Sequence, residues 1–417
     1  MAKISTQNVQ PGMIVKKDIK DKNGRLLLPE NSQLEEKHIR ILKIWGIYEV
    51  DIDQAEEEEE KNLQSSNLTV QDIKYASKII RPKYANTNTN HPCIREIFKQ
   101  NALLIAQKVS EGEDIENAGA INLPNKEEFQ EQRYTGNMQG ITLNSLLDRN
   151  LELSSLPDIF YKVNEIINNP RTSARDIAQV VEKDTALTAR MLKLVNSPFY
   201  GFPQKIETIS KAVTVIGTKQ LSMLALGISV TKLFSEVPST YLDMQKFWKH
   251  CLGVGICAKL ISEHMDYSES EKLFVAGILH DIGRLIMLKK IPQQTAMALK
   301  YTWDNDSFLS KAERQCIGFT HTKLGSELCT NWKIPPLLVD LVTYHHNPTQ
   351  AKYSLECSIL HLAELIVNAL DIGTSGEKMV LYLNEKAWEN LNISSKVIVP
   401  IVEQLRNELD VILEILK

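Results

Sequence analysis

The chain has 417 residues, which at about 100 to 200 residues per domain predicts two or three domains and excludes a single small module. Hydrophobic residues make up 43% and charged residues 24% of the chain, so the composition excludes collagen-like, low-complexity and wholly disordered proteins. The 48 Lys and Arg residues against 52 Asp and Glu residues give a net charge of −4, which provides no overall basic field for binding nucleic acid.

The first residues lack the apolar core of a secretory signal peptide, and no segment approaches the roughly 18 apolar residues of a membrane-spanning helix. We therefore expect a cytoplasmic protein without a membrane span. The six cysteines form no CxxC pair, which is typical of buried, reduced thiols in that compartment.

Residues 1–53 are expected to form a small α+β module at the N-terminus. Two β-forming runs flank Asn23 and Gly24, a pair that tolerates the positive φ angles of a tight hairpin turn. A helical pattern follows over residues 34–45, and a strand-like run occupies residues 47–52.

Residues 54–140 are polar and predict a connector that is partly helical. Five consecutive glutamates at 56–60 repel one another and are typical of a solvated segment. Helical patterns cover residues 70–80 and 94–109, and the segment 111–140 is rich in residues that favour irregular structure.

Residues 141–417 predict an all-helical domain with a C-terminal helical extension. Ser155, Ser173 and Asp184 each stand where a helix N-cap is expected, before apolar residues that recur at intervals of three and four. A turn over residues 196–201 is expected to end one of these helices. The expected fold class is therefore mainly α.

Histidine is concentrated in one part of this helical region. Seven of the nine histidines lie between residues 250 and 361, where an even distribution would place roughly two or three. Imidazole is the commonest nitrogen ligand for Zn, Fe, Ni and Mn, so the concentration indicates a metal site.

The local contexts of these histidines strengthen that interpretation. His280-Asp281 follows a strongly apolar run, and His345-His346 repeats a paired arrangement on another predicted helix. His250 shares a helical face with apolar residues and is expected to point into the core. A single buried histidine is usually hydrogen-bonded to a carbonyl, but two adjacent pairs together favour a shared metal.

Two further histidines have other predicted roles. His264 lies beside acidic residues at a helix end and is expected to be solvated. His361 fits three roles equally: a core group, a group that orients a ligand, or a ligand itself.

The chain resembles the HDOD branch of the HD superfamily of metal-dependent phosphohydrolases, a relative of the HD-GYP phosphodiesterases. The resemblance covers roughly residues 148–368 and is carried by Leu-Pro-Asp-Ile-Phe at 156–160 and by the runs 177–201 and 206–217, followed by the His-Asp pair. Residues 10–52 also resemble the small module that precedes some HD-GYP domains.

The resemblance implies an all-α domain that holds a mononuclear or binuclear centre of Fe, Mn, Zn or Ni. The metal ligands that it implies are His250, His280, Asp281, His321, His345, His346 and Glu364. The family more often has aspartate at the last of these positions. The alternative is that the metal has been lost and the histidines are relics.

Three departures from the HD-GYP pattern bear on activity. The Gly-Tyr-Pro element that follows the histidine pair in those enzymes is absent here. Lys246 stands one helical turn before His250, where it would repel a third cation. Arg284 stands where HD-GYP enzymes often have lysine, so it either contacts a substrate phosphate or pairs with a structural carboxylate.

Two functions follow from these features. The first is a bacterial signal-transduction protein whose HDOD domain acts as a metal-capable regulatory or scaffold module, with a signalling protein as partner. The alternative is an active phosphohydrolase, in which Asp281 and Arg284 are catalytic and a cyclic dinucleotide is the substrate. A nucleotide second messenger is a candidate ligand in either case, and nucleic acid is not expected as a partner.

Overall fold

The computed structural model divides into two compact units, one comprising residues 1–77 and 102–113 and the other residues 78–101 and 114–417. The structure describes residues 2–6, 9, 13–20, 26–30, 32–35, 37–39, 42, 47, 49–52, 68–113, 141–147, 158–169, 171–202, 204–231 and 241–416. Within these ranges, no helix combines the length and the apolar character needed to cross a bilayer.

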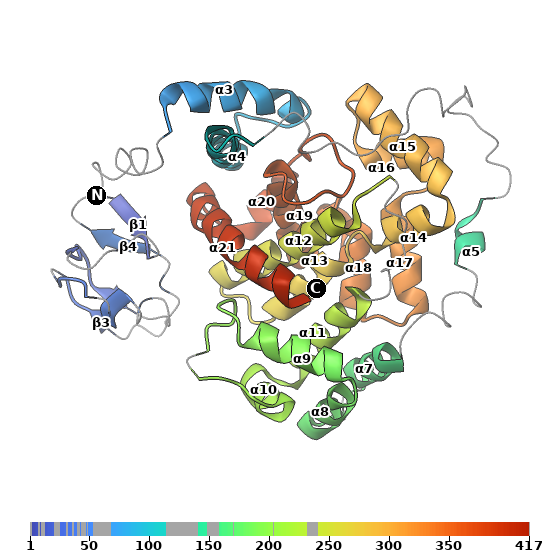
Figure 1. Ribbon diagram of the computed structural model, residues 1–417, viewed down its shortest axis with the longest axis horizontal. Helices are drawn as coiled ribbons and strands as arrows, with labels where there is room; N and C mark the ends of the chain where they lie inside the picture. Colours follow the sequence, from blue (N-terminus) through green and yellow to red (C-terminus); the bar gives the residue numbers. More distant parts are fainter. Residues whose placement is uncertain are drawn as a thin grey trace. The chain divides into compact units, whose positions relative to one another are not determined.

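The first unit contains two small antiparallel sheets (Figure 1). Strand β1 (Ala2–Ser5) pairs with β4 (Glu49–Ile52), and β2 (Ile19–Lys20) pairs with β3 (Leu26–Leu28). The pairing of β2 with β3 agrees with the expected hairpin, although Asn23 and Gly24 lie outside the described residues. The core of this unit consists of Val9, Val15, Ile19, Leu28, Leu34, Leu42 and Val50. The predicted α+β module is confirmed.

Two helices follow where the sequence predicted them: α3 (Val70–Ile80) and α4 (Pro92–Ser110). The sequence predicted a connector over residues 54–140, but residues 78–101 belong to the helical unit. Lys83 explains this difference, because its Nζ lies 2.6 Å from Asp371 Oδ2 and its carbonyl accepts a hydrogen bond from Val380 N–H (2.8 Å).

From residue 141 on, the described part of the second unit contains helices joined by irregular segments, and no strands. Its first helices are α5 (Leu143–Leu146), α7 (Asp158–Asn168), α8 (Ala174–Glu182), α9 (Thr185–Val195), α10 (Ile209–Ile216) and α11 (Thr218–Thr231). Ser173 and Asp184 cap α8 and α9 as predicted, and Ser155 lies outside the described residues. Asn196 ends α9, and its side chain exchanges two hydrogen bonds with the backbone of Ile206 (2.7 and 2.8 Å).

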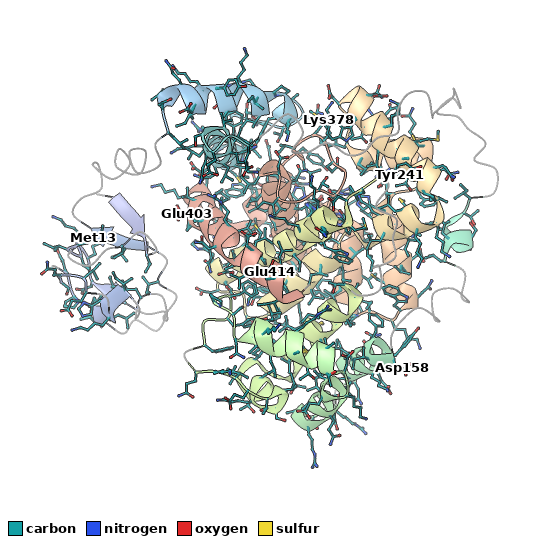
Figure 2. The ribbon with its side chains drawn as sticks, viewed as in Figure 1. Met13, Asp158, Tyr241, Lys378, Glu403 and Glu414 are labelled. Atoms are coloured by element: carbon teal, nitrogen blue, oxygen red, sulfur yellow. The ribbon has the colours of Figure 1, made fainter. Side chains whose placement is uncertain are left out.

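The remaining helices include α12, which packs most extensively against α13, α19 and α21 (Figure 1). They are α12 (Met244–His264), α13 (Ser270–Leu279), α14 (Ile282–Lys290), α15 (Pro292–Asn305), α16 (Leu309–Cys316), α17 (His321–Asn331), α18 (Pro336–Tyr344), α19 (Ser354–Ala369), α20 (Glu385–Leu391) and α21 (Ile398–Leu416). Side chains fill the space between these helices (Figure 2). The mainly α fold class is confirmed.

A pair of glycines brings α12 and α13 together. A Cβ atom on Gly277 would overlap the backbone of Gly255, so only hydrogen atoms can separate the two helices at this point. The close approach places the ring of His250 on α12 with its centroid 5.4 Å from that of His280 at the end of α13.

A buried lysine joins the turn after α9 to the centre of the unit. Lys259 is 2% exposed, and its ammonium lies 3.9 Å from the ring centroids of both Phe199 and Tyr200. The same ammonium lies 3.4 Å from Glu271 and 3.5 Å from Glu263. Because cation–π contacts and ion pairs compensate its burial, Lys259 anchors the segment 196–201 on α12.

We predict that Gly277→Ala destabilises the protein by about 1 to 3 kcal/mol, because the new methyl group forces α12 and α13 apart. Urea unfolding followed by circular dichroism measures the change. Gly227→Ala is the control, since its Cβ would meet only side-chain atoms of Val275 and Ile278, at 3.1 and 3.3 Å. Equal effects of the two substitutions would contradict the proposed close contact of the helices.

Glu408 on α21 predicts a pH dependence of stability. Burial raises its pKa to about 7, above its ordinary value of 4.5, although a hydrogen bond from Gln404 opposes the shift. The folded state therefore holds a proton that the unfolded state releases above pH 4.5, and this contribution to stability is lost as the pH rises through 7.

Glu408→Gln should therefore gain stability relative to the native protein between pH 5 and pH 8. Urea unfolding at several pH values in that window measures the difference. Glu389→Gln, at an exposed position of α20, is the control. A difference that stays constant across the window would contradict this role of Glu408.

Candidate metal centre

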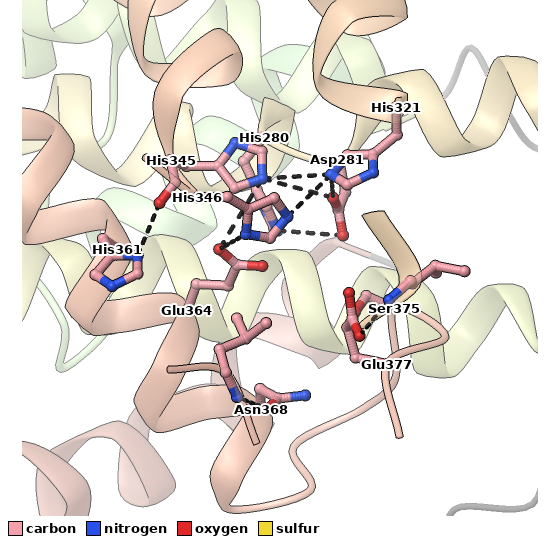
Figure 3. Close-up of polar contacts among 12 residues, drawn as sticks. His280, Asp281, His321, His345, His346, His361, Glu364, Asn368, Ser375 and Glu377 are labelled. Atoms are coloured by element: carbon pink, nitrogen blue, oxygen red, sulfur yellow. Dashed lines mark hydrogen bonds and ion pairs between the residues drawn. The ribbon is translucent and has the colours of Figure 1, made fainter. Parts of the chain in front are cut away.

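The helical unit brings all seven predicted metal ligands together, and Figure 3 labels all of them except His250. They come from five places: His250 on α12, His280 and Asp281 between α13 and α14, His321 at the first position of α17, His345 and His346 directly after α18, and Glu364 on α19. The sequence analysis expected the histidine pair on a helix, and the structure places it at the helix end.

Nearly all of these side chains are buried. The exposed fraction of His346 is 18%, whereas the other six residues are at most 1% exposed. Burying so many polar groups is costly unless each finds a partner, so the arrangement itself calls for a compensating charge.

The donor atoms form two groups of three. His321, His345 and His346 make one group, and His250, His280 and Glu364 make the other. Within each group the donor atoms lie within 4.8 Å of one another.

Asp281 lies between the two groups. Its Oδ1 is 3.3 Å from His321 Nε2, and its Oδ2 is 3.3 Å from His280 Nε2. The carboxylate thus faces one imidazole of each group, as a bridging ligand would.

Backbone carbonyls fix the tautomers of the imidazoles. Nδ1 of His280 donates to the carbonyl of Gly277 (2.7 Å), and Nδ1 of His345 donates to that of Val342 (3.0 Å). Because a carbonyl can only accept, each Nδ1 carries the proton, and the neutral ring presents a bare Nε2 to the site. The ring of His250 likewise bonds to the backbone of Ile372 while its Nε2 has no partner.

The unpaired atoms show that the residues present fit a cation. Several buried acceptors that converge on the site have no hydrogen-bond partner among the described residues: Nε2 of His250, Nε2 of His280, Oδ1 of Asp281, and both carboxylate oxygens of Glu364. Nε2 of His321 also lies only 3.5 Å from the bare Nε2 of His345. A mixed nitrogen and carboxylate donor set suits Zn, Fe, Mn or Ni better than Mg or Ca.

The pKa shifts describe the same site before a cation binds. Burial lowers the pKa of His250 to about 3 and holds the pKa values of His345 and His346 well below their ordinary value. Burial also raises the pKa of Glu364 to about 8. His280 differs: burial lowers its pKa, but the charges of Asp281 and Glu364 and the hydrogen bonds to Asp281 and Gly277 together raise it above the ordinary value. His250, His345 and His346 are therefore held neutral, with ring-nitrogen lone pairs available to a cation.

Arg284 is held by carboxylates and a backbone carbonyl. Its Nη1 donates to Asp281 Oδ2 (2.7 Å) and to the carbonyl of Ser375 (3.0 Å), and its Nη2 donates to Glu377 Oε1 (3.4 Å). Its side chain is 3% exposed, and its Nε lies 3.6 Å from Glu313 Oε1. The sequence left two roles open for Arg284, and its observed contacts match the second, pairing with buried carboxylates.

His361 uses both of its ring nitrogens within the protein. Nδ1 donates to the carbonyl of His345 (2.8 Å), and Nε2 accepts from Asn384 N–H (3.2 Å). Of its three candidate roles, the geometry matches a group that orients a ligand, because neither nitrogen remains for a metal. His264 ends α12 and belongs to neither donor group.

Sequence reasoning missed two buried carboxylates of this region, Glu313 and Glu377. Glu313 lies on the buried face of α16, beside Leu309, Ala312 and Cys316, and a charged residue on such a face is the one signal that could have found it. Glu377 lies in the irregular segment 371–384, where no periodicity points to burial.

Comparison with known proteins identifies this part of the chain. Residues 153–348 match the model of the HDOD domain family. The chain contains an HDOD domain. Six of the seven grouped side chains lie within the matched range of the HDOD domain, whereas Glu364 and Glu377 follow it.

Solved structures share the fold of this HDOD domain. An HDOD domain protein with unknown function from Geobacter sulfurreducens is 24% identical, covers 63% of this chain and 92% of its own, and has a TM-score of 0.55. A protein from Shewanella amazonensis SB2B, proposed to be a phosphohydrolase, is 22% identical over 67% of this chain and 98% of its own, with a TM-score of 0.51.

Two other relatives complete the comparison. A protein from Marinobacter aquaeolei VT8, proposed to act in signal transduction, is 20% identical over 73% of this chain and 68% of its own, with a TM-score of 0.50. An uncharacterized protein from Treponema pallidum (strain Nichols) is 23% identical over 56% of this chain, and the match spans only 46% of that relative.

We predict that Arg284→Met destabilises the metal-free protein by about 3 to 5 kcal/mol, because the substitution leaves buried carboxylates without their cation. Combining it with Glu377→Gln should recover part of the loss, since one of those charges is then removed. Urea unfolding in the presence of a chelator measures both variants. If the single and double variants were equally unstable, Glu377 would have no electrostatic coupling to Arg284.

Proposed function

We propose that this chain is a signalling protein whose HDOD domain binds a divalent metal in a closed, regulatory site. The observation that carries the proposal is the convergence of buried donor atoms without hydrogen-bond partners, contributed by His250, His280, Asp281 and Glu364. A cation would compensate all of them together, and no arrangement of protein hydrogen bonds in the described structure does so.

The two donor groups assign roles to the ligands. His321, His345 and His346 would hold one ion, His250, His280 and Glu364 would hold another, and Asp281 would contribute to both. An ion so bound would act as a Lewis acid and lower the pKa of a coordinated water. The anchored Nδ1 atoms of the imidazoles keep their Nε2 atoms directed at the site whether or not an ion is present.

The segment 371–384 supports a regulatory role, because it is hydrogen-bonded to the backbone around the donor residues. Thr374 N–H donates to the carbonyl of Lys246 (3.0 Å), and the hydroxyl of Tyr382 donates to that of His346 (3.0 Å). Gly373 has a φ of +67°, and a side chain there would overlap the backbone of His250. These contacts tie the segment to the backbone around His250 and His346.

An active phosphohydrolase is the second candidate, and the retained donor set favours it. The two groups of three with Asp281 between them provide the ligands that a binuclear hydrolytic centre requires. His346, the one partly exposed donor, would face an entering substrate. In this alternative, Arg284 would have to leave Glu377 to contact a phosphate, and a cyclic dinucleotide is the substrate class to test.

The partners are part of the same proposal. A signalling protein would bind the HDOD domain differently when the site holds metal and when it does not. A nucleotide second messenger is the candidate small ligand. The description of the Marinobacter aquaeolei protein as acting in signal transduction supports this assignment by analogy of fold alone.

The test compares the metal content of full-length protein purified without chelator with that of the His280→Ala/Asp281→Ala variant. We expect near-stoichiometric metal in the native protein and at least about tenfold less in the variant, because the variant loses a ligand and the central carboxylate. His264→Ala, a histidine outside the donor groups, is the control and should retain its metal. Hydrolysis of bis(p-nitrophenyl) phosphate and of cyclic di-GMP is measured on the same samples.

The outcomes separate the two candidates. Metal without hydrolysis supports the regulatory site. Hydrolysis that is lost together with the metal establishes the phosphohydrolase in its place. Native protein that takes up no Mn²⁺ or Zn²⁺, even when these are supplied after purification, would overturn both metal-dependent functions.

A further inference from the structure

His321 differs from the other buried histidines in the partner of its Nδ1 atom. Nδ1 of His280 and of His345 donate to backbone carbonyls, whereas Nδ1 of His321 lies 2.7 Å from the carboxylate oxygen Oε2 of Glu313. A carboxylate is a stronger acceptor than a carbonyl, and a charge-assisted hydrogen bond is about twice as strong as a neutral one.

The same oxygen holds the backbone of His321. Glu313 Oε2 also accepts the backbone N–H of His321 (2.9 Å), which is the first residue of α17 and has no acceptor within the helix for that group. One carboxylate oxygen therefore fixes both the position of the residue and the rotation of its ring.

The path of the chain makes this contact possible. Helix α16 ends at Cys316, Gly318 has a φ of +97°, and Thr320 caps α17, so the chain reverses between Glu313 and His321. Neither residue is exposed by more than 2%. The contact is therefore shielded from water, where it is worth more than at the surface.

The charge of Glu313 has one compensating group in the described structure. The guanidinium of Arg284 lies with its Nε 3.6 Å from Glu313 Oε1, while its Nη1 holds Asp281. Arg284 thus compensates the charges of the two carboxylates that contact His321. Glu313 lies at Nδ1, and Asp281 lies at Nε2 (3.3 Å).

We propose that Glu313 is the positioning residue of the centre. It holds His321 in the Nδ1–H tautomer and increases the basicity of Nε2, so that this atom binds a divalent cation more tightly. The proposal rests on the proposed function, because it assumes that the donor groups bind a metal. Glu313 is not itself a metal ligand in this proposal, and it acts through His321.

The experiment measures Mn²⁺ and Zn²⁺ affinity of the full chain by competition with a chelator. Glu313→Ala should bind each ion about 10 to 100 times more weakly than the native protein. Glu313→Gln keeps an oxygen that can accept both N–H groups but has no charge, so its affinity should fall between the two. Glu408→Gln is the control: it also loses a buried carboxylate, but the hydrogen-bond partner that the structure shows for Glu408 is Gln404 on the same helix, and its affinity should stay within about threefold of native.

A second measurement does not require metal. In protein labelled with ¹⁵N histidine and kept free of metal, the ¹⁵N shifts of His321 report which ring nitrogen carries the proton. The native protein should show the Nδ1–H tautomer alone, and Glu313→Ala should show a mixture of tautomers.

The results can overturn the inference separately from the proposed function. Native protein that binds no metal would refute the proposed function, while the tautomer measurement would still decide whether Glu313 orients His321. If the native protein binds metal but Glu313→Ala has native affinity and native ¹⁵N shifts, Glu313 is not a positioning residue. Should Glu313→Ala fail to fold, the nearly isosteric Glu313→Gln is compared with Glu408→Gln instead.

Discussion

The carboxylate of Asp281 is completely buried, and its negative charge organises the groups around it. Arg284 holds Oδ2 through a 2.7 Å hydrogen bond, which leaves Oδ1 facing His321 without a hydrogen-bond partner. The same guanidinium also contacts Glu313 and Glu377. In the proposed centre, a cation on the side of Oδ1 would compensate the carboxylate oxygen that Arg284 does not hold.

In His280, His321 and His345 the two ring nitrogens have separate tasks. Nδ1 is anchored to a group of the protein, a carbonyl for His280 and His345 and a carboxylate for His321. Nε2 is left for the centre. Because the anchors belong to helices or their ends, the ligand geometry is present before any ion binds, and little conformational entropy remains to be lost on binding.

The segment 371–384 is hydrogen-bonded to residues around the centre. A buried irregular segment must find partners for its backbone, and this one finds them on the site itself, at Arg284, Lys246 and the carbonyl of His346. A complete donor set is therefore compatible with a regulatory role. Six of the seven grouped side chains are at most 1% exposed, so an ion held there would be shielded from solvent.

The sequence by itself determined the mainly α fold class, the helices over 70–80 and 94–109, the N-cap of Ser173 and the HDOD resemblance, because these depend on residues close together in the chain. It also singled out the seven side chains that the fold brings together. Only the tertiary structure decided that His361 orients rather than faces the centre and that Glu313 and Glu377 belong to the site. Contacts such as that of Arg284 with Glu377, 93 residues later, follow from the packing of separate helices, and no local pattern of charge or hydrophobicity encodes them.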